Sequence, residues 1–97
     1  MPIKMRLYAR GNELLVAACD AELIGRTLRE GDVRLQVGEF YDGDVVSAED
    51  LADQVRNSTM GNFVGEETVA ACLRHGLIGE EGVVRIGGVP HAQLYVL

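Results

Sequence analysis

The 97-residue chain has no tryptophan, two prolines, two cysteines and a single lysine, Lys4. Two cysteines, Cys19 and Cys72, are too few for a disulfide-stabilised secreted scaffold, so we expect a reducing, cytoplasmic location. The longest apolar run, residues 14–19, is far shorter than the roughly 20 residues that a membrane-spanning helix needs. No apolar segment follows the first charged residues either, so we expect no signal peptide and no membrane partner.

Basic side chains are scarce, and their distribution is uneven. The chain has 15 acidic and 9 basic residues, which give a formal charge of −6. Residues 1–34 carry six basic and five acidic side chains, whereas residues 35–97 carry three basic and ten acidic ones. The acidic total weakens long-range attraction to nucleic acid, but the first third of the chain is neutral to basic. With 47% apolar residues, the chain suits a single folded domain over residues 1–97.

Periodicity predicts a β-hairpin at the start of the chain. Apolar and polar residues alternate over residues 3–10, and a second strand is predicted over 13–18, with Gly11 in the turn between them. Asp20 then suits the N-cap of a short helix over 21–28. A third strand is predicted over 33–37.

The second half of the sequence predicts helices and then strands. Ser47 is a suitable N-cap for a helix over 48–57. Another helix is predicted within residues 60–75, with Asn62 as its N-cap and with Gly65 inside it. The last two strands are predicted over 83–86 and 91–97. The fold class is therefore α+β, with a mainly antiparallel sheet and two to three helices packed on one side.

The first strand places four polar side chains on one face of the sheet, since residues two apart point the same way. This set, which Arg34 would join if the third strand lay nearby, is Lys4, Arg6, Tyr8 and Arg10. Arginine and lysine bind phosphates and tyrosine stacks on bases, so the face is a candidate nucleic-acid interface. The alternative is an ordinary solvated face covered by charged side chains.

A second candidate site lies near the end of the chain, where Gly87 and Gly88 precede His91 and Gln93. Two glycines allow backbone N–H groups to turn toward an anion, and a histidine can exchange a proton near neutral pH. Gln93 shares the strand face of His91, so both could converge on one polar ligand. The alternative is a tight turn before an edge strand.

Cys19 and Asp20 form a third candidate, with Cys19 as a nucleophile and His91 as its base. Burial within an apolar run and the adjacent carboxylate both disfavour a thiolate, so an inert cysteine beside a capping aspartate is the alternative. Cys72 and His75 could in principle join Cys19 and His91 around zinc. Their spacing matches no established zinc motif, so we predict no metal site and no cofactor.

Several short motifs are spread over almost the whole chain, and the hexapeptide at residues 88–93 is the most specific of them. They are Ala18-Cys19-Asp20, Leu23-Ile24-Gly25, Phe40-Tyr41, Gly43, Asn62, Gly65 and Gly88-Val89-Pro90-His91-Ala92-Gln93. With these motifs the sequence resembles a family of small archaeal proteins known as domain of unknown function 424. The resemblance implies an archaeal cytoplasmic protein and favours an RNA or translation partner, but it implies no catalytic residue.

These observations favour a small binding module that acts with RNA or with a translation component. In this interpretation the basic strand face contacts phosphates, and Asn62, His91 and Gln93 recognise a polar ligand. One alternative is a small enzyme in which His91 is the acid or base and Asn62 and Gln93 orient the substrate. Another is a structural homodimer formed through the C-terminal strand, residues 94–97.

Overall fold

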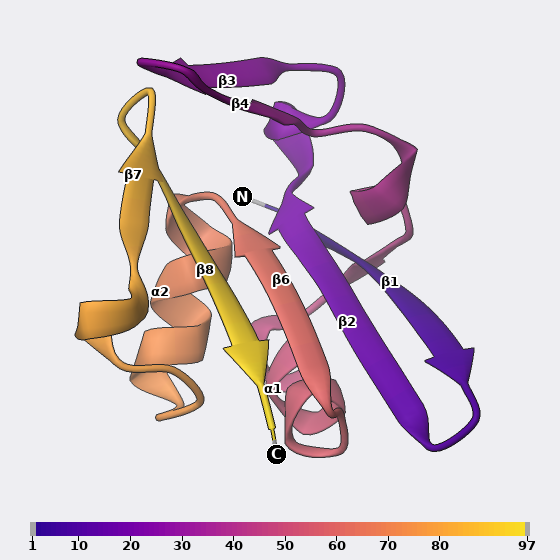
Figure 1. Ribbon diagram of the computed structural model, residues 1–97. Coiled ribbons are helices and arrows are strands. Elements are labelled where there is room, and N and C mark those ends of the chain that lie inside the picture. Colours follow the sequence, from indigo (N-terminus) through magenta and orange to yellow (C-terminus); the bar gives the residue numbers. More distant parts are fainter. Residues whose placement is uncertain (1, 97) are drawn as a thin grey trace.

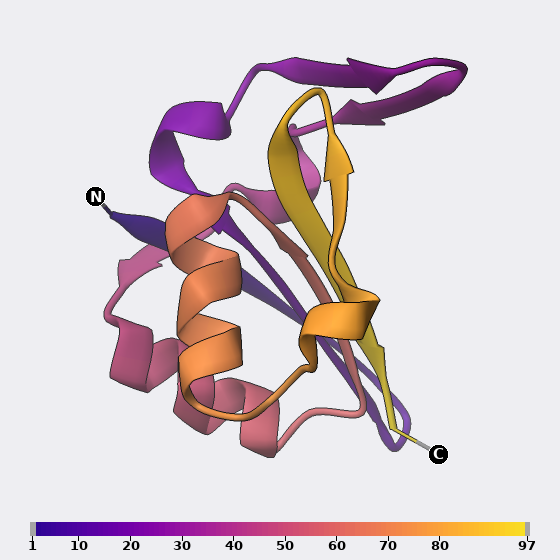
Figure 2. The same cartoon turned by 90° about the vertical axis from the view of Figure 1, so that its left-hand side faces the viewer.

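The protein is an antiparallel-rich sheet with two helices on one face (Figures 1 and 2). The structure, a computed structural model, describes residues 2–96. Its strands are β1 (Ile3–Arg10), β2 (Glu13–Asp20), β3 (Thr27–Glu30), β4 (Val33–Gln36), β5 (Asp44–Val46), β6 (Met60–Val64), β7 (Val84–Ile86) and β8 (Val89–Tyr95). Its helices are α1 (Ala48–Arg56) and α2 (Glu66–Arg74), and its 3-10 turns are η1 (Ala21–Leu23), η2 (Glu39–Tyr41) and η3 (Glu80–Gly82).

Six of the strands form the main sheet, in the order β5-β1-β2-β6-β8-β7. Only β2 and β6 run parallel; the other neighbours in this sheet pair antiparallel. Strands β3 and β4 pair with each other as a separate hairpin. The predicted α+β class, with a mainly antiparallel sheet, is therefore confirmed.

The sheet is buried on both faces, because alternate side chains of β2 belong to two different cores. Val16 and Ala18 point into a core formed with α1 and α2, whereas Ala17 and Cys19 point into a second core. That second core is closed by η1, η2 and the β3–β4 hairpin, which crosses one end of the sheet (Figure 2). We call the sheet side opposite the helices the η2 face. It faces the viewer in Figure 1.

The predicted helix over 21–28 is wrong. The chain makes only the three-residue turn η1 there and then continues into β3. Gly25, at φ +91°, breaks the helical path, and its N–H donates to the carbonyl of Val37. The pairing of β3 with β4 thus outweighs the local preference of residues 21–28 for a helix. Asp20 precedes this turn but gives it no side-chain hydrogen bond.

The second predicted helix begins later than expected, at Glu66, because residues 60–64 form β6. Asn62 is therefore a strand residue, and the prediction that it caps the helix is wrong. Gly65 is the N-cap residue, at φ +119°, and not an internal helical position. The predicted cap of α1 is confirmed, since Ser47 accepts a hydrogen bond from the Asp50 N–H at 3.0 Å.

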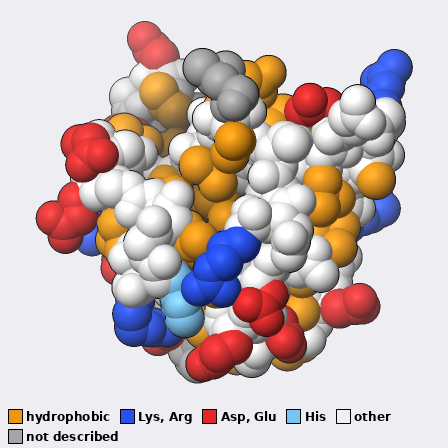
Figure 3. Space-filling view, turned by 90° about the horizontal axis from the view of Figure 1, so that it is seen from below, with side chains coloured by type: hydrophobic (Ala, Val, Ile, Leu, Met, Phe, Trp, Pro, Cys, Tyr) orange, Lys and Arg blue, Asp and Glu red, His pale blue; other side chains and the backbone are white. Residues whose placement is uncertain are grey.

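The lower end of the molecule carries the β1–β2 turn and the C-terminus (Figure 1). Seen from that end, hydrophobic side chains gather near the centre and acidic side chains occupy much of the rim (Figure 3). Strand β8 starts at Val89, and residue 97 of the predicted last strand lies outside the described residues. Beyond His91 the strand pairs with β6 alone. None of the helices over residues 2–96 has the length and apolar character needed to cross a membrane.

Candidate functional site

The strand register arranges the η2 face in rows of side chains, because cross-strand partners point to the same side of a sheet. Three rows matter for the site, and each crosses β1, β2, β6 and β8. They are Tyr8–Leu15–Met60–Tyr95, Arg6–Ala17–Asn62–Gln93 and Lys4–Cys19–Val64–His91. The middle row brings two carboxamide side chains, Asn62 of β6 and Gln93 of β8, next to each other.

Asn62 is the centre of a hydrogen-bonded network. The Tyr41 hydroxyl donates to its Oδ1 at 2.6 Å, and Nε2 of His91 lies 3.2 Å from the same oxygen. Burial raises the pKa of Tyr41 to about 12, so this hydroxyl stays a donor at neutral pH. Burial also lowers the pKa of His91, which favours the neutral imidazole. Because an amide oxygen can only accept, the tautomer that bonds to Oδ1 is the one with its proton on Nε2.

This network fixes the orientation of the Asn62 side chain. Both donors bind Oδ1, so the amide nitrogen and its two hydrogens point the other way. Among the described residues, no side-chain or backbone acceptor takes a hydrogen bond from that nitrogen. The network therefore presents a fixed amide donor to whatever occupies the adjacent space.

A surface cavity of about 210 Å³ borders the two carboxamides. Its lining is largely apolar and aromatic, and it spans the lower half of the η2 face. The lining residues are Leu15, Phe40, Met60, Gly61, Asn62, Gln93, Leu94 and Tyr95. We call this cavity the carboxamide groove. Tyr95 is 68% exposed and Phe40 is 39% exposed, so both rings are accessible to a ligand.

The basic strand face of the sequence analysis exists, but most of it contacts η2. Lys4 Nζ binds the Asp42 carboxylate at 2.6 Å, and Arg6 donates to the carbonyl of Glu39 at 2.8 Å. These contacts hold η2 against β1 and occupy the two cations. Arg10, in contrast, is exposed at the end of β1.

Tyr8 also fastens η2. Its hydroxyl donates to the carbonyl of Phe40 at 2.8 Å, and the two rings stack with centroids 5.1 Å apart. The guanidinium of Arg6 lies 5.3 Å from the centre of the Tyr8 ring. Arg34 does not join this face, because β4 pairs with β3 and not with the main sheet. The five predicted nucleic-acid contacts are thus divided between two parts of the molecule.

The two glycines of the β7–β8 turn do not form an anion site together, because their polar groups bind side chains of opposite charge. The Gly87 N–H donates to the Glu30 carboxylate at 3.0 Å, and the Gly88 carbonyl accepts from Arg85 at 2.8 Å. A Cβ on Gly87 would lie 2.9 Å from the carbonyl oxygen of Arg29, which explains a glycine there. This turn therefore anchors the β3–β4 hairpin, and its Gly87 N–H is already taken.

Cys19 and Asp20 do not form a catalytic pair with His91. Cys19 and His91 flank Val64 on neighbouring strands, so they lie two strand spacings, or about 10 Å, apart. Burial, with help from the neighbouring Asp20, raises the pKa of the Cys19 thiol to about 12. Asp20 faces the helix side, where its carboxylate accepts hydrogen bonds from Thr68 and Glu67.

Of the candidate residues, Asn62, His91 and Gln93 come together, and Tyr41 completes the site. The sequence assigned no role to Tyr41, although the pair Phe40-Tyr41 is one of the motifs of the family resemblance. Its contact with Asn62 crosses from η2 to β6, which no local pattern predicts. No cluster of three or more potential metal-ligating side chains occurs among residues 2–96.

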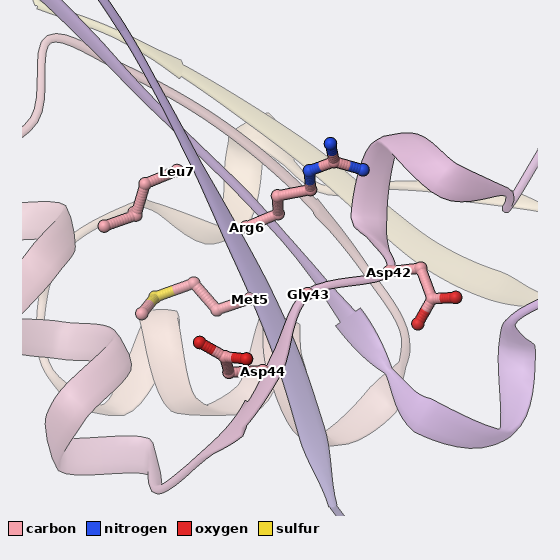
Figure 4. A pocket seen from close by; sticks show the side chains of 6 residues that line it. All are labelled: Met5, Arg6, Leu7, Asp42, Gly43 and Asp44. Carbon is pink, nitrogen blue, oxygen red and sulfur yellow. The ribbon is translucent and has the colours of Figure 1, made fainter.

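A larger cavity, of about 340 Å³, lies where β5 diverges from β1 (Figure 4). Figure 4 shows Arg6 and Asp42 on one side of β1, and Met5 and Asp44 on the other. Its charged groups therefore do not converge on one point. Gly43 approaches the backbone so closely that a Cβ there would overlap the carbonyl of Met5. This cavity is therefore a weaker candidate for a ligand site than the carboxamide groove, whose two carboxamides lie side by side.

Comparison with protein families gives a match over residues 8–97 to the family described as protein of unknown function (DUF424). The chain belongs to the DUF424 family. The match includes η2, β6 and β8, and so every member of the Tyr41–Asn62–His91 network. This confirms the family resemblance inferred from the sequence.

One solved structure is similar along the whole DUF424 chain. It is an uncharacterized conserved protein from Methanopyrus kandleri, with a TM-score of 0.85 and 26% sequence identity. The alignment covers 100% of this chain and 93% of the other. A search of curated proteins gives no match. The function must therefore be argued from the site.

Proposed function

We propose that this protein is a small cytoplasmic binding module for single-stranded RNA, which takes a base into the carboxamide groove. The observation that carries the proposal is the pair Asn62 and Gln93, two cross-strand carboxamides in a groove with accessible aromatic rings. Single-stranded RNA is recognised through bases that stack on aromatic side chains and hydrogen-bond along their edges. The groove combines both elements.

The size of the groove supports a small planar ligand. Its volume of about 210 Å³ is below the 300–1,000 Å³ typical of pockets for whole small molecules and cofactors. A nucleobase attached to a flexible strand needs no full enclosure, because the rest of the strand stays on the surface. Tyr95 and Phe40 supply exposed rings on which a base can stack.

The hydrogen-bonding pattern favours a base over a phosphate in the groove. Asn62 presents amide hydrogens in a fixed orientation, and Gln93 adds a donor and an acceptor beside them. Such a set pairs with the carbonyl oxygens and ring nitrogens of a base edge. The neutral Tyr41 and His91 bring no positive charge that would select an anion.

An enzyme is a weaker interpretation of the same residues. Nε2 of His91 is engaged by Asn62, which limits its use as an acid or base. Cys19 is a buried thiol with a pKa raised to about 12, so it is not an activated nucleophile. A binding role uses the network as it stands, without rearrangement.

Fluorescence anisotropy with labelled single-stranded RNA tests the proposal. We expect saturable binding that weakens as salt rises, because phosphate contacts release counterions. Tyr95→Ser should weaken binding by about 5- to 150-fold, as expected for loss of one stacked base, and Tyr95→Phe should preserve it. Val45→Ser is a matched control, since Val45 is 63% exposed on the far edge strand β5. Absence of binding at low salt would overturn the proposal.

A further inference from the structure

The β3–β4 hairpin is firmly seated on the sheet by one of its two faces. Leu28 is buried in the second core, and Leu35 packs against the same cluster. On that side Glu30 also accepts the hydrogen bond from Gly87 N–H at 3.0 Å. The hairpin crosses the upper end of the molecule with its other face turned away from the core (Figures 1 and 2).

The outward face carries two arginines directly opposite each other. Arg29 and Arg34 are cross-strand partners, and both side chains are exposed. Cross-strand partners have Cβ atoms about 5 Å apart, and like charges at that separation destabilise a sheet. Among the described residues neither arginine takes part in an ion pair, because the three pairs found there involve Lys4, Arg56 and Arg85.

The polar neighbours of these arginines suit an oxyanion ligand. Thr27 and Gln36, the next partners along the hairpin on the same face, add a hydroxyl and an amide donor. The one acidic side chain of β3, Glu30, is on the opposite face and is bound to Gly87. In a protein of net charge −6, this hairpin face therefore holds two adjacent cations that have no partner within the described chain.

We infer that the outward face of the β3–β4 hairpin is a phosphate-binding site, in which Arg29 and Arg34 together hold the backbone of a nucleic-acid strand. Two guanidinium groups side by side offer parallel N–H donors to phosphate oxygens, a geometry that arginine provides and lysine does not. A bound phosphate also relieves the repulsion between the two cations. That the phosphates are those of the RNA in the carboxamide groove rests on the proposed function.

The hairpin and the groove lie at opposite ends of the η2 face. The hairpin covers the end where Cys19 and Val64 are buried, and the groove lies beyond Asn62 toward Tyr95. A mononucleotide therefore reaches only one of the two sites, whereas a strand of several nucleotides reaches both. We expect affinity to rise steeply with oligonucleotide length until both are occupied.

The salt dependence of RNA binding by the full chain tests the inference. The double variant Arg29→Gln/Arg34→Gln should reduce the slope of log K against log salt by about 0.7 for each phosphate contact that is lost. The matched control is Arg56→Gln/Arg74→Gln, which removes the same charge from the helix side and should leave the slope unchanged. The melting temperature of the hairpin variant should be no lower than that of wild type, because the substitutions remove a pair of like charges.

The outcomes separate this inference from the proposed function. If wild type binds RNA and the hairpin variant keeps the full slope, the phosphate site is wrong and the groove proposal stands. If wild type does not bind RNA, the proposed function fails, and tripolyphosphate becomes the probe of the hairpin. Saturable shifts of the Arg29 and Arg34 side-chain resonances with tripolyphosphate would support the site, and their absence would overturn it.

Discussion

The carboxylate of Asp20 occupies the space that a side chain on Gly65 would need. An ideal Cβ on Gly65 would lie 2.3 Å from the Asp20 Cγ, and Gly65 itself adopts φ +119°. The same carboxylate, 3% exposed, accepts hydrogen bonds from the N–H groups of Glu67 and Thr68 and from the Thr68 hydroxyl. Asp20 thus accepts hydrogen bonds from backbone N–H groups in the first turn of α2, which lie 47 and 48 residues away in sequence, and Gly65 leaves room for its carboxylate.

Gly65→Ala should destabilise the protein by about 3 kcal/mol or more, because it adds both a steric overlap and a strained backbone conformation. Gly76→Ala is the matched control. Gly76 also has positive φ, at +68°, but its Cβ would meet open space, so it should cost only about 1 kcal/mol. Denaturant unfolding measures both free energies.

A double-mutant cycle between Asp20→Ala and Gly65→Ala then separates overlap from strain. In the Asp20→Ala background, Gly65→Ala should cost at least about 1 kcal/mol less than in wild type, because the overlapping carboxylate is gone. Additive free energies would contradict the contact between these two residues.

The stability of the protein should depend on pH through His91. Burial lowers the pKa of His91 in the folded state below its ordinary value of 6.5, so the unfolded chain binds this proton more readily. The contribution is therefore fully present above pH 6.5 and is lost as pH falls below 6.5 toward the folded-state pKa. Urea unfolding from pH 7.5 to 5.5 should show wild type losing more stability than His91→Gln. Parallel curves for the two proteins would show that His91 is not shielded from water.

Both cysteines should be unreactive in the folded protein. Burial raises the pKa of Cys19 and of Cys72 to about 12, so almost no thiolate exists at pH 8. A thiol reagent such as Ellman's reagent should label neither residue natively and both in guanidinium chloride. Rapid native labelling that Cys19→Ser abolishes would restore Cys19 as a candidate nucleophile.

Local patterns predicted the elements whose signals lie within a few residues. The alternation in residues 3–10, the turn at Gly11 and the cap at Ser47 each appear where the sequence placed them. The region 21–28 was mispredicted because its conformation depends on Gly25 and on the pairing of β3 with β4. Likewise, residues 60–64 are a strand because they fit between β2 and β8, which is tertiary information.

The candidate site was predicted in part for the same reason. The shared strand face of His91 and Gln93 follows from alternation, and the register then brings Asn62 beside them. The docking of η2 could not be predicted, so Tyr41 was missed, and Lys4 and Arg6 were expected to contact phosphates and not Asp42 and Glu39. Arg34 was expected beside the first strand, but it lies on the separate β3–β4 hairpin, directly opposite Arg29.

The most direct test of the account is an NMR titration of isotope-labelled protein with a single-stranded RNA of about eight nucleotides. The side-chain amide resonances of Asn62 and Gln93 should shift saturably with base-bearing RNA. They should stay in place with an abasic strand of equal length, which has the phosphates but no base for the groove. If both amides stay unshifted with saturating RNA, or shift equally with the abasic strand, base recognition in the carboxamide groove is contradicted.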